Sequence, residues 1–131
     1  YQAYGPASGK IKFLSYYFPA ATDNAVNKAM IADITKAGGT PDLFSPDGFV
    51  AAQMIVHAVQ QADGDNVDKM ISALQGWTFD APKGRETVRA SDHAMLQPMF
   101  QAKLVQQGGA WAPQLIDTVP ADKTAPPEKG N

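Results

Sequence analysis

The chain has 131 residues, 44% of them hydrophobic and 18% charged, with a formal net charge of -2 at pH 7. This composition is typical of one globular domain and excludes a disordered segment. No cluster of lysine or arginine stands out, which argues against a nucleic-acid surface. The absence of cysteine excludes disulfides and thiolate metal sites. Without a run of about 18 apolar residues, no membrane span is predicted.

The first predicted element is a strand over residues 11–16, "IKFLSY". Aromatic and β-branched residues fill this run, which favours a strand buried on both faces. Pro19 ends the strand, because proline cannot donate to a sheet ladder. Residues that cap helices well follow at once: Thr22, Asp23 and Asn24.

An amphipathic helix is predicted next, with one apolar side and one largely polar side. Its apolar side carries Val26, Met30, Ile31 and Ile34. Gly38 and Gly39 supply the left-handed residue with which many helices end. We expect this helix to lie on the surface.

The second predicted helix, residues 46–61, is apolar over most of its circumference. Ser45 is the expected N-cap, and Pro46 suits the first helical position because its missing N–H has no partner inside the helix. The polar residues form one narrow stripe: Gln53, His57, Gln60 and Gln61. Such a helix needs apolar partners on several sides. One early strand is too little to cover it, so we expect sheet strands from outside the chain.

After this helix the pattern changes. Asp65 is the expected cap of a short third helix, and from Gly76 onward β-forming residues alternate with turn residues. The stretch "WTFDAPKGRETVRASDH" therefore predicts short strands joined by tight turns.

A β-hairpin is predicted near the C-terminus. Residues 97–105 and 111–119 flank "QQGGA", whose paired glycines are typical of a hairpin turn. The tail, residues 120–131, has three prolines and no large apolar residue, so we expect it to be extended. The order of elements predicts an α/β fold.

The sequence contains few candidates for catalysis. Ser91, Asp92 and His93 have the composition of a triad, but adjacent residues cannot usually orient one another as a triad requires. A turn in which Ser91 and Asp92 bond the local backbone is favoured. A hydrolase using Ser91 or His93 is therefore kept only as a third hypothesis, after the two functions that are given below. His57 is one of only two histidines, which favours a solvated or core-edge position over a metal ligand. We therefore predict no catalytic residue, no metal site and no cofactor.

Phe44 precedes the second helix and has two interpretations of equal weight. It could be a hydrophobic residue that staples the entry of the helix. It could also be an aromatic side chain at the mouth of a cleft, where open α/β folds bind ligands beside helix N-termini.

Three stretches of the chain resemble a known family. "DLFSPDGFVAAQMI" and "ALQGWTFDAPKGRETVRASDHAMLQPMFQAKLV" resemble the C-terminal part of periplasmic substrate-binding proteins of ABC transporters, in the leucine/isoleucine/valine-binding-protein-like (type I) group. "YFPAATDNAVNKAMIADITKAGGTPD" resembles the segment just before it. The resemblance covers about residues 11–119.

The resemblance implies a two-lobed α/β fold in which the chain crosses three times between the lobes. This chain would be the C-terminal fragment of that fold. Residues 11–16 and 97–119 would be second-lobe strands, and residues 20–95 first-lobe helices and strands, with crossings near 17–19 and 97–100. The apolar helix would then be covered by the missing N-terminal portion, or by another copy of the chain.

The resemblance also implies a site and a function. Phe44 would contact the apolar part of a ligand, Ser45 and Asp47 would line the cleft, and Tyr17 would contribute from the crossing. An acid at Asp47, where many relatives have an uncharged polar residue, leaves the ligand open. The expected protein is not an enzyme. It is a periplasmic solute-binding component that closes on a branched-chain or hydrophobic amino acid, or a similar small solute, and docks on a membrane permease. The alternative is an effector-sensing domain of a regulatory protein on the same scaffold.

Overall fold

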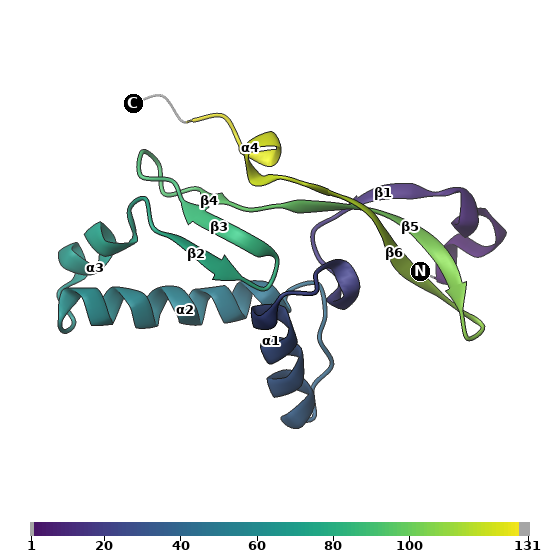
Figure 1. The fold of residues 1–131 in the computed structure, drawn as a ribbon, viewed down its shortest axis with the longest axis horizontal. Coiled ribbons are helices and arrows are strands. Elements are labelled where there is room, and N and C mark those ends of the chain that lie inside the picture. Colours follow the sequence, from purple (N-terminus) through teal and green to yellow (C-terminus); the bar gives the residue numbers. More distant parts are fainter. Residues whose placement is uncertain (1, 129–131) are drawn as a thin grey trace.

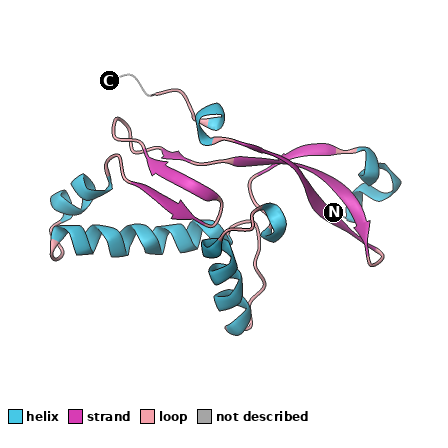
Figure 2. Cartoon of the chain, in the orientation of Figure 1, coloured by secondary structure: helices cyan, strands magenta, loops and turns pink. Residues whose placement is uncertain are grey.

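Two antiparallel three-stranded sheets organise the fold, and the chain passes between them (Figure 1; Figure 2). The computed structural model describes residues 2–128. The strands are β1 (Lys12–Ser15), β2 (Thr78–Ala81), β3 (Gly84–Val88), β4 (Met95–Leu96), β5 (Met99–Gln107) and β6 (Ala110–Val119). The α-helices are α1 (Ala25–Lys36), α2 (Ser45–Ala62), α3 (Val67–Leu74) and α4 (Ala121–Thr124), and η1 (Gln2–Lys10) and η2 (Pro19–Ala21) are 3-10 helices.

The first sheet has the order β1-β5-β6. The expected hairpin joins β5 to β6, and Gly108 and Gly109 both have positive φ, 56° and 84°, as a tight hairpin turn of this kind requires. Phe100 and Ala102 of β5 pack with Phe18 and Ala21 from the segment after β1. This small core fixes the start of the helical region against the sheet.

The expectation that the strand at residues 11–16 is buried on both faces is wrong. The strand is β1, it pairs only with β5, and it lies at the edge of the sheet. Leu14 is 57% exposed, because nothing in the described chain covers the outer face of this strand.

The second sheet, β2-β3-β4, lies against α2 (Figure 1). Phe79 and Ala81 of β2 point to one face because side chains alternate along a strand, and Val88 of β3 joins them there. These three residues pack against Val50 of α2. This face of α2 is thus covered by strands of the chain itself, while the expected strands from outside the chain remain a prediction.

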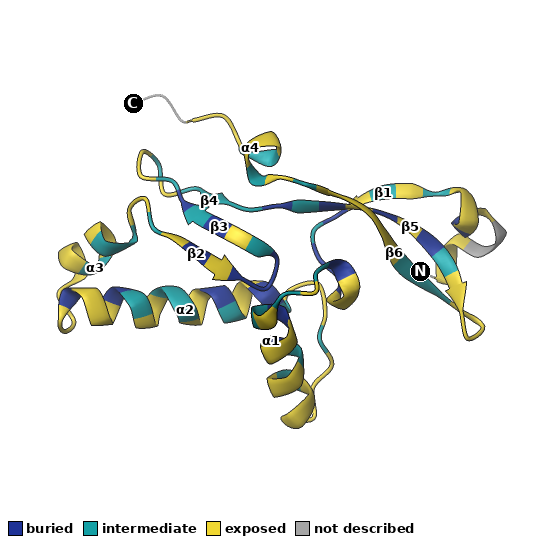
Figure 3. Ribbon diagram, in the orientation of Figure 1, coloured by how far each residue is buried: buried dark blue, intermediate teal, exposed yellow. Residues whose placement is uncertain are grey.

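One side of α2 lacks a partner within residues 2–128. The helix α3 covers part of α2, but Ile55, Val56 and Val59 are 60%, 55% and 41% exposed (Figure 3). Burial of these side chains would stabilise the protein, because each Å² of apolar surface removed from water contributes roughly 25 cal/mol of free energy. The described chain therefore covers only part of the apolar circumference read from the sequence.

The helix caps agree only partly with prediction. Asn24 caps α1, its side chain accepting a hydrogen bond from the N–H of Asn27. Ser45 does not cap α2: it is the first helical residue, and the Asp42 carboxylate accepts from its N–H instead. Asp65 does not cap α3, because Asn66 is the residue whose side chain reaches a backbone N–H three residues on.

The tail returns to the second sheet. Residues 121–124 form α4 where an extended chain was expected, and the Thr124 hydroxyl donates to the Gln97 carbonyl at 2.8 Å. Arg89 Nη1 donates to the Pro126 carbonyl at 2.9 Å. Residues 129–131 lie outside the described residues, so the expectation of an extended tail is not tested there.

Candidate functional site

A cluster of polar side chains lies where the chain passes from one sheet to the other. We call it the crossing cluster, and its members are Tyr16, Asp47, Lys83, Glu86 and Gln97. Tyr16 follows β1 and Gln97 stands between β4 and β5, so both lie on connections between the sheets. Asp47 belongs to the first turn of α2, and Lys83 and Glu86 to the β2–β3 hairpin. Four separate segments therefore meet in one place.

Tyr16 ties the first connection to α2. Its hydroxyl donates a hydrogen bond to the Asp47 carboxylate and lies 3.1 Å from Gln97 Oε1. Burial, followed by the bond to Asp47, raises the pKa of the Tyr16 hydroxyl. The hydroxyl therefore keeps its proton and serves as a donor.

Lys83 is buried, at 1% exposure, although lysine is rarely buried. Its Nζ donates to Gln97 Oε1 at 3.2 Å and lies 3.4 Å from the centroid of the Tyr16 ring, a cation–π contact. Burial lowers the pKa of Lys83 to about 8, against the attraction of Glu86 and Asp47. Lys83 therefore loses its positive charge at a lower pH than an exposed lysine does.

Glu86 is equally buried, at 1% exposure, and its Oε1 has no hydrogen-bond partner. The ion pairs found among residues 2–128 do not include it. Burial raises the pKa of Glu86 to about 7, with Lys83 acting in the opposite direction. A buried oxygen without a partner is uncommon in folded proteins, so this one needs an explanation.

A cavity of about 220 Å³ opens beside these groups. Its polar wall consists of Tyr16, Asp47, Glu86 and Gln97. Its apolar wall consists of Val50, Ala51, Met54 and Met95. The volume is below that of a typical complete ligand pocket, about 300–1,000 Å³, and suits one end of a small molecule.

The structure brings three of the four predicted site residues together at the start of α2. Asp47 belongs to the crossing cluster, and the Ser45 hydroxyl donates to Asp42 at 3.0 Å. Phe44 is 70% exposed in the described chain. Tyr17 lies apart: it is 1% exposed and its hydroxyl donates to Asn27 Oδ1 at 2.7 Å.

Sequence reasoning missed four members of the cluster: Tyr16, Lys83, Glu86 and Gln97. A signal for one of them was present. Glu86 stands two residues before the buried Val88, so strand alternation places both on the inner face of β3. A charged residue in phase with a buried one is a reason to look for a site.

The remaining sequence candidates do not form sites. Asp92 is taken up by Arg89, whose Nε and Nη2 donate to it at 2.8 and 2.6 Å, so no triad forms with Ser91 or His93. The His57 ring stacks on Trp77 with centroids 3.9 Å apart. Within residues 2–128 there is no group of three metal-ligating side chains, and no helix is long and apolar enough to cross a membrane.

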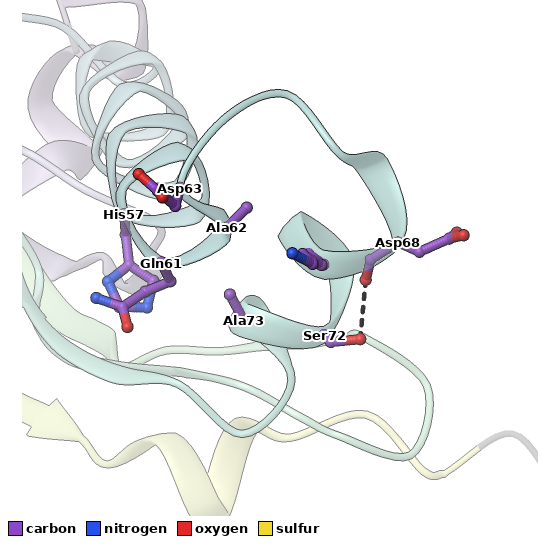
Figure 4. A pocket seen from close by; sticks show the side chains of 8 residues that line it. His57, Gln61, Ala62, Asp63, Asp68, Ser72 and Ala73 are labelled. Atoms are coloured by element: carbon purple, nitrogen blue, oxygen red, sulfur yellow. Dashed lines mark hydrogen bonds between the residues drawn. The ribbon is translucent and has the colours of Figure 1, made fainter.

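A larger hollow, about 660 Å³, lies between the end of α2 and α3 (Figure 4). The Asp68 carboxylate points away from it, and the Ser72 hydroxyl donates to the Asp68 carbonyl at 2.8 Å. These two polar groups therefore do not converge on the hollow, which is open to solvent. The crossing cluster is the better candidate site.

Comparison with known proteins places the chain among binding proteins. The model of the periplasmic binding protein family matches residues 1–110. No curated protein sequence matches the chain. Among solved structures, an ABC-type branched-chain amino acid transporter protein of Rhodopseudomonas palustris CGA009 is 29% identical, with a TM-score of 0.81 over 92% of this chain and 33% of its own.

Two further structures agree on the fold. An R. palustris solute-binding protein in complex with benzoate is 26% identical, with a TM-score of 0.66 over 86% of this chain and 31% of its own. A leucine-, isoleucine-, valine-, threonine- and alanine-binding protein of Brucella ovis, in a closed conformation, is 18% identical. Its TM-score is 0.76 over 95% of this chain and 35% of its own. The chain thus spans about a third of the length of the structures that it matches.

Proposed function

The chain belongs to the periplasmic binding protein family, and from this premise we propose that it is the C-terminal third of an extracytoplasmic solute-binding component of an ABC transporter. The family and its solved relatives are solute-binding proteins rather than enzymes. The function is therefore capture of a small solute, followed by docking on a membrane permease.

We assign the two sheets to two lobes. The β1-β5-β6 sheet belongs to one lobe, and the β2-β3-β4 sheet with α1, α2 and α3 to the other. The exposed row of Ile55, Val56 and Val59 supports a further partner for α2. We propose that first-lobe strands from a preceding segment cover this row, rather than another copy of the chain.

The observation that carries the proposal is the position of the crossing cluster. Tyr16 and Gln97 lie on the connections between the sheets, and Asp47 lies at the helix end beside them. A hinge is a short segment that absorbs a change of backbone angles between two bodies. Side chains at such a segment change their surroundings when the lobes close, so a ligand bound there shifts the open–closed equilibrium.

Phe44, Ser45 and Asp47 are the proposed cleft-facing residues at the start of α2. Phe44 offers an exposed aromatic face, while the adjoining cavity offers polar groups. The printed names of relatives include both a branched-chain amino acid transporter protein and a benzoate complex. The ligand proposed for this chain is an amino acid or a similar small organic acid.

The Phe44→Ala variant of the complete two-lobed protein tests this assignment. Loss of one aromatic contact weakens ligand binding by roughly 1–3 kcal/mol, or about 5- to 150-fold. The thermal midpoint without ligand stays unchanged, because Phe44 is 70% exposed. Calorimetric titration and a melt of the same variant separate the two effects.

Leu14→Ala is the control, since it truncates an exposed apolar side chain on β1, away from α2. It leaves ligand affinity unaltered. Normal binding by Phe44→Ala, together with a much lower melting temperature, would show that Phe44 supports the helix and does not touch the ligand.

A further inference from the structure

We propose that residues 120–127 act as a splint across the connection between β4 and β5, and that this splint limits how far the two sheets move relative to one another. The inference rests on the proposed function, because an open–closed equilibrium requires that the two sheets belong to different lobes. It gives a conformational role to the tail, which lines no part of the cavity beside the crossing cluster.

The splint begins on the first sheet. Val119, the last residue of β6, pairs with Met99 at the start of β5. Pro120 follows, and because proline has no N–H to donate, the ladder does not continue past it. The chain then turns into α4, which lies beside β4 of the second sheet (Figure 1). The tail therefore leaves one sheet and runs along the other.

The middle of the splint is attached to the connection itself. Gln97 and Pro98 form the connection between β4 and β5. The half-buried Thr124 donates its hydroxyl hydrogen bond to the Gln97 carbonyl at 2.8 Å. The side chain of Gln97 belongs to the crossing cluster, where its Oε1 accepts from Tyr16 and Lys83. One residue thus joins the tail to the candidate site.

The far end of the splint is held by the second sheet. Arg89 follows β3 directly, and its Nη1 donates to the Pro126 carbonyl at 2.9 Å. Its Nη2 lies 3.5 Å from the Pro127 carbonyl oxygen. Two consecutive prolines have little backbone freedom to lose, so few hydrogen bonds are enough to hold them. Asp92 accepts two hydrogen bonds from the same guanidinium, which keeps the anchor in place.

The splint bridges residues whose backbone angles change if the two sheets move apart. A hinge closes through changes of backbone angles in a few connecting residues. The tail is anchored on both sides of Gln97 and Pro98. A large change of angles there must break the Thr124 bond or pull Pro126 from Arg89. Release of the splint therefore widens the range of sheet positions and lowers the fraction of protein in which the cavity is formed.

Distances between spin labels on the two sides of the connection test the splint in the complete two-lobed protein. The labels are attached through Lys69→Cys on α3 and Gln107→Cys at the end of β5, both exposed positions. A protein that ends at Val119 lacks the splint. The matched control ends at Glu128 and keeps every contact named above. Without ligand, we expect a broader distance distribution in the first protein and an unchanged one in the control.

Thr124→Val is a milder test that leaves the tail complete. It keeps the size of the side chain and removes the hydroxyl that holds the Gln97 carbonyl. We expect a broader distance distribution and, in calorimetric titration, roughly fivefold weaker binding of leucine or benzoate, the usual effect of one lost hydrogen bond. Thr35→Val is the control, because the Thr35 hydroxyl donates to the Ile31 carbonyl inside α1.

The outcomes separate the splint from the proposed function. Equal distance distributions in the proteins that end at Val119 and at Glu128 overturn the splint, and binding of leucine or benzoate by both leaves the proposed function intact. If a melt shows that the protein ending at Val119 is unfolded, Thr124→Val decides, and a distribution equal to that of Thr35→Val overturns the splint. An unaltered protein that binds neither probe and keeps one fixed distance overturns the proposed function and the splint together.

Discussion

The charged side chains at the two ends of the β2-β3-β4 sheet differ in how completely they are hydrogen-bonded. Beyond one end, Arg89 and Asp92 form a short two-point ion pair, with side chains only 13% and 11% exposed. Arg89 also donates to the Pro126 carbonyl, and Asp92 accepts from the N–H of Ala94. At the other end, Glu86 and Lys83 are more deeply buried, yet Glu86 lacks a partner for one oxygen.

The difference distinguishes a saturated structural pair from the cluster proposed to bind a ligand. Charges that are fully hydrogen-bonded hold a loop and a tail in place and have no capacity left for a ligand. The cluster around Glu86 retains an unused acceptor and a cavity beside it, so part of its interaction energy is available for binding. Two polar clusters on one small sheet thus differ in their degree of saturation, and the unsaturated one is the site proposed for binding.

The largest effect is expected from a variant that breaks the Arg89–Asp92 ion pair. Asp92→Ala leaves the Arg89 guanidinium without its carboxylate, so we expect a larger loss of unfolding free energy than removal of an exposed ion pair causes. Urea unfolding of the complete protein measures this loss. Asp80→Ala, which removes an exposed ion pair, is the control and costs under about 1 kcal/mol. A loss for Asp92→Ala no larger than that of Asp80→Ala would mean that the two sites do not differ in this way.

The second prediction concerns pH. The pKa of Glu86 is raised from 4.5 to about 7 in the folded protein, so folded Glu86 binds more protons than unfolded Glu86 between these values. Stability that is present below pH 4.5 is therefore lost as pH rises to 7, by about 3 kcal/mol for a shift of this size. The pKa of Lys83, about 8, lies above this window.

Urea unfolding at several pH values, with Glu86→Gln as reference, isolates the effect of Glu86. Without ligand, the variant is more stable than the unaltered protein at pH 7.5, and the two converge at pH 4.5. Parallel curves for the two proteins across this range would show that Glu86 has its ordinary acidity.

The smallest effect is expected from removal of the Tyr16 hydroxyl. Tyr16→Phe removes the hydrogen bond to Asp47 and the contact with Gln97, which costs about 1 kcal/mol because the hydroxyl is only partly buried. Tyr4→Phe, on an exposed tyrosine, is the control. Thermal unfolding of both variants measures the difference, and equal midpoints would show that the Tyr16 bond adds no stability.

Local patterns in the sequence anticipated much of the fold. The paired glycines placed the β5–β6 turn, and Asn24 capped α1, because each depends on a few neighbouring residues. The helix predicted over residues 46–61 is α2, extended by one residue at each end. Elements that are defined by their own hydrophobic periodicity and by the residues that start and end them are predictable in this way.

Long-range contacts could not be anticipated. Ser45 is a good cap by residue type, but Phe44 occupies the N-cap position of α2 because of the path of the preceding loop, in which Asp42 accepts from the Ser45 N–H. The edge position of β1 depends on which strands are near it in space. The lack of a hydrogen bond to Glu86 Oε1 depends on Lys83 donating to Gln97, a contact that no local pattern encodes. Of the crossing cluster, only Asp47 was therefore predicted.

The pairing of β1 with β5 constrains the order in which the protein folds. Lys12 pairs with Lys103, so the first sheet is split in sequence by the whole of the second sheet and its helices. The β5–β6 hairpin closes a short loop and can form early, whereas β1 must close a loop that contains α1, α2 and α3. During synthesis β1 leaves the ribosome long before its partner exists. The second sheet and its helices are therefore an insertion in the first sheet, and we expect β1 to pair with β5 only after the β5–β6 hairpin has formed.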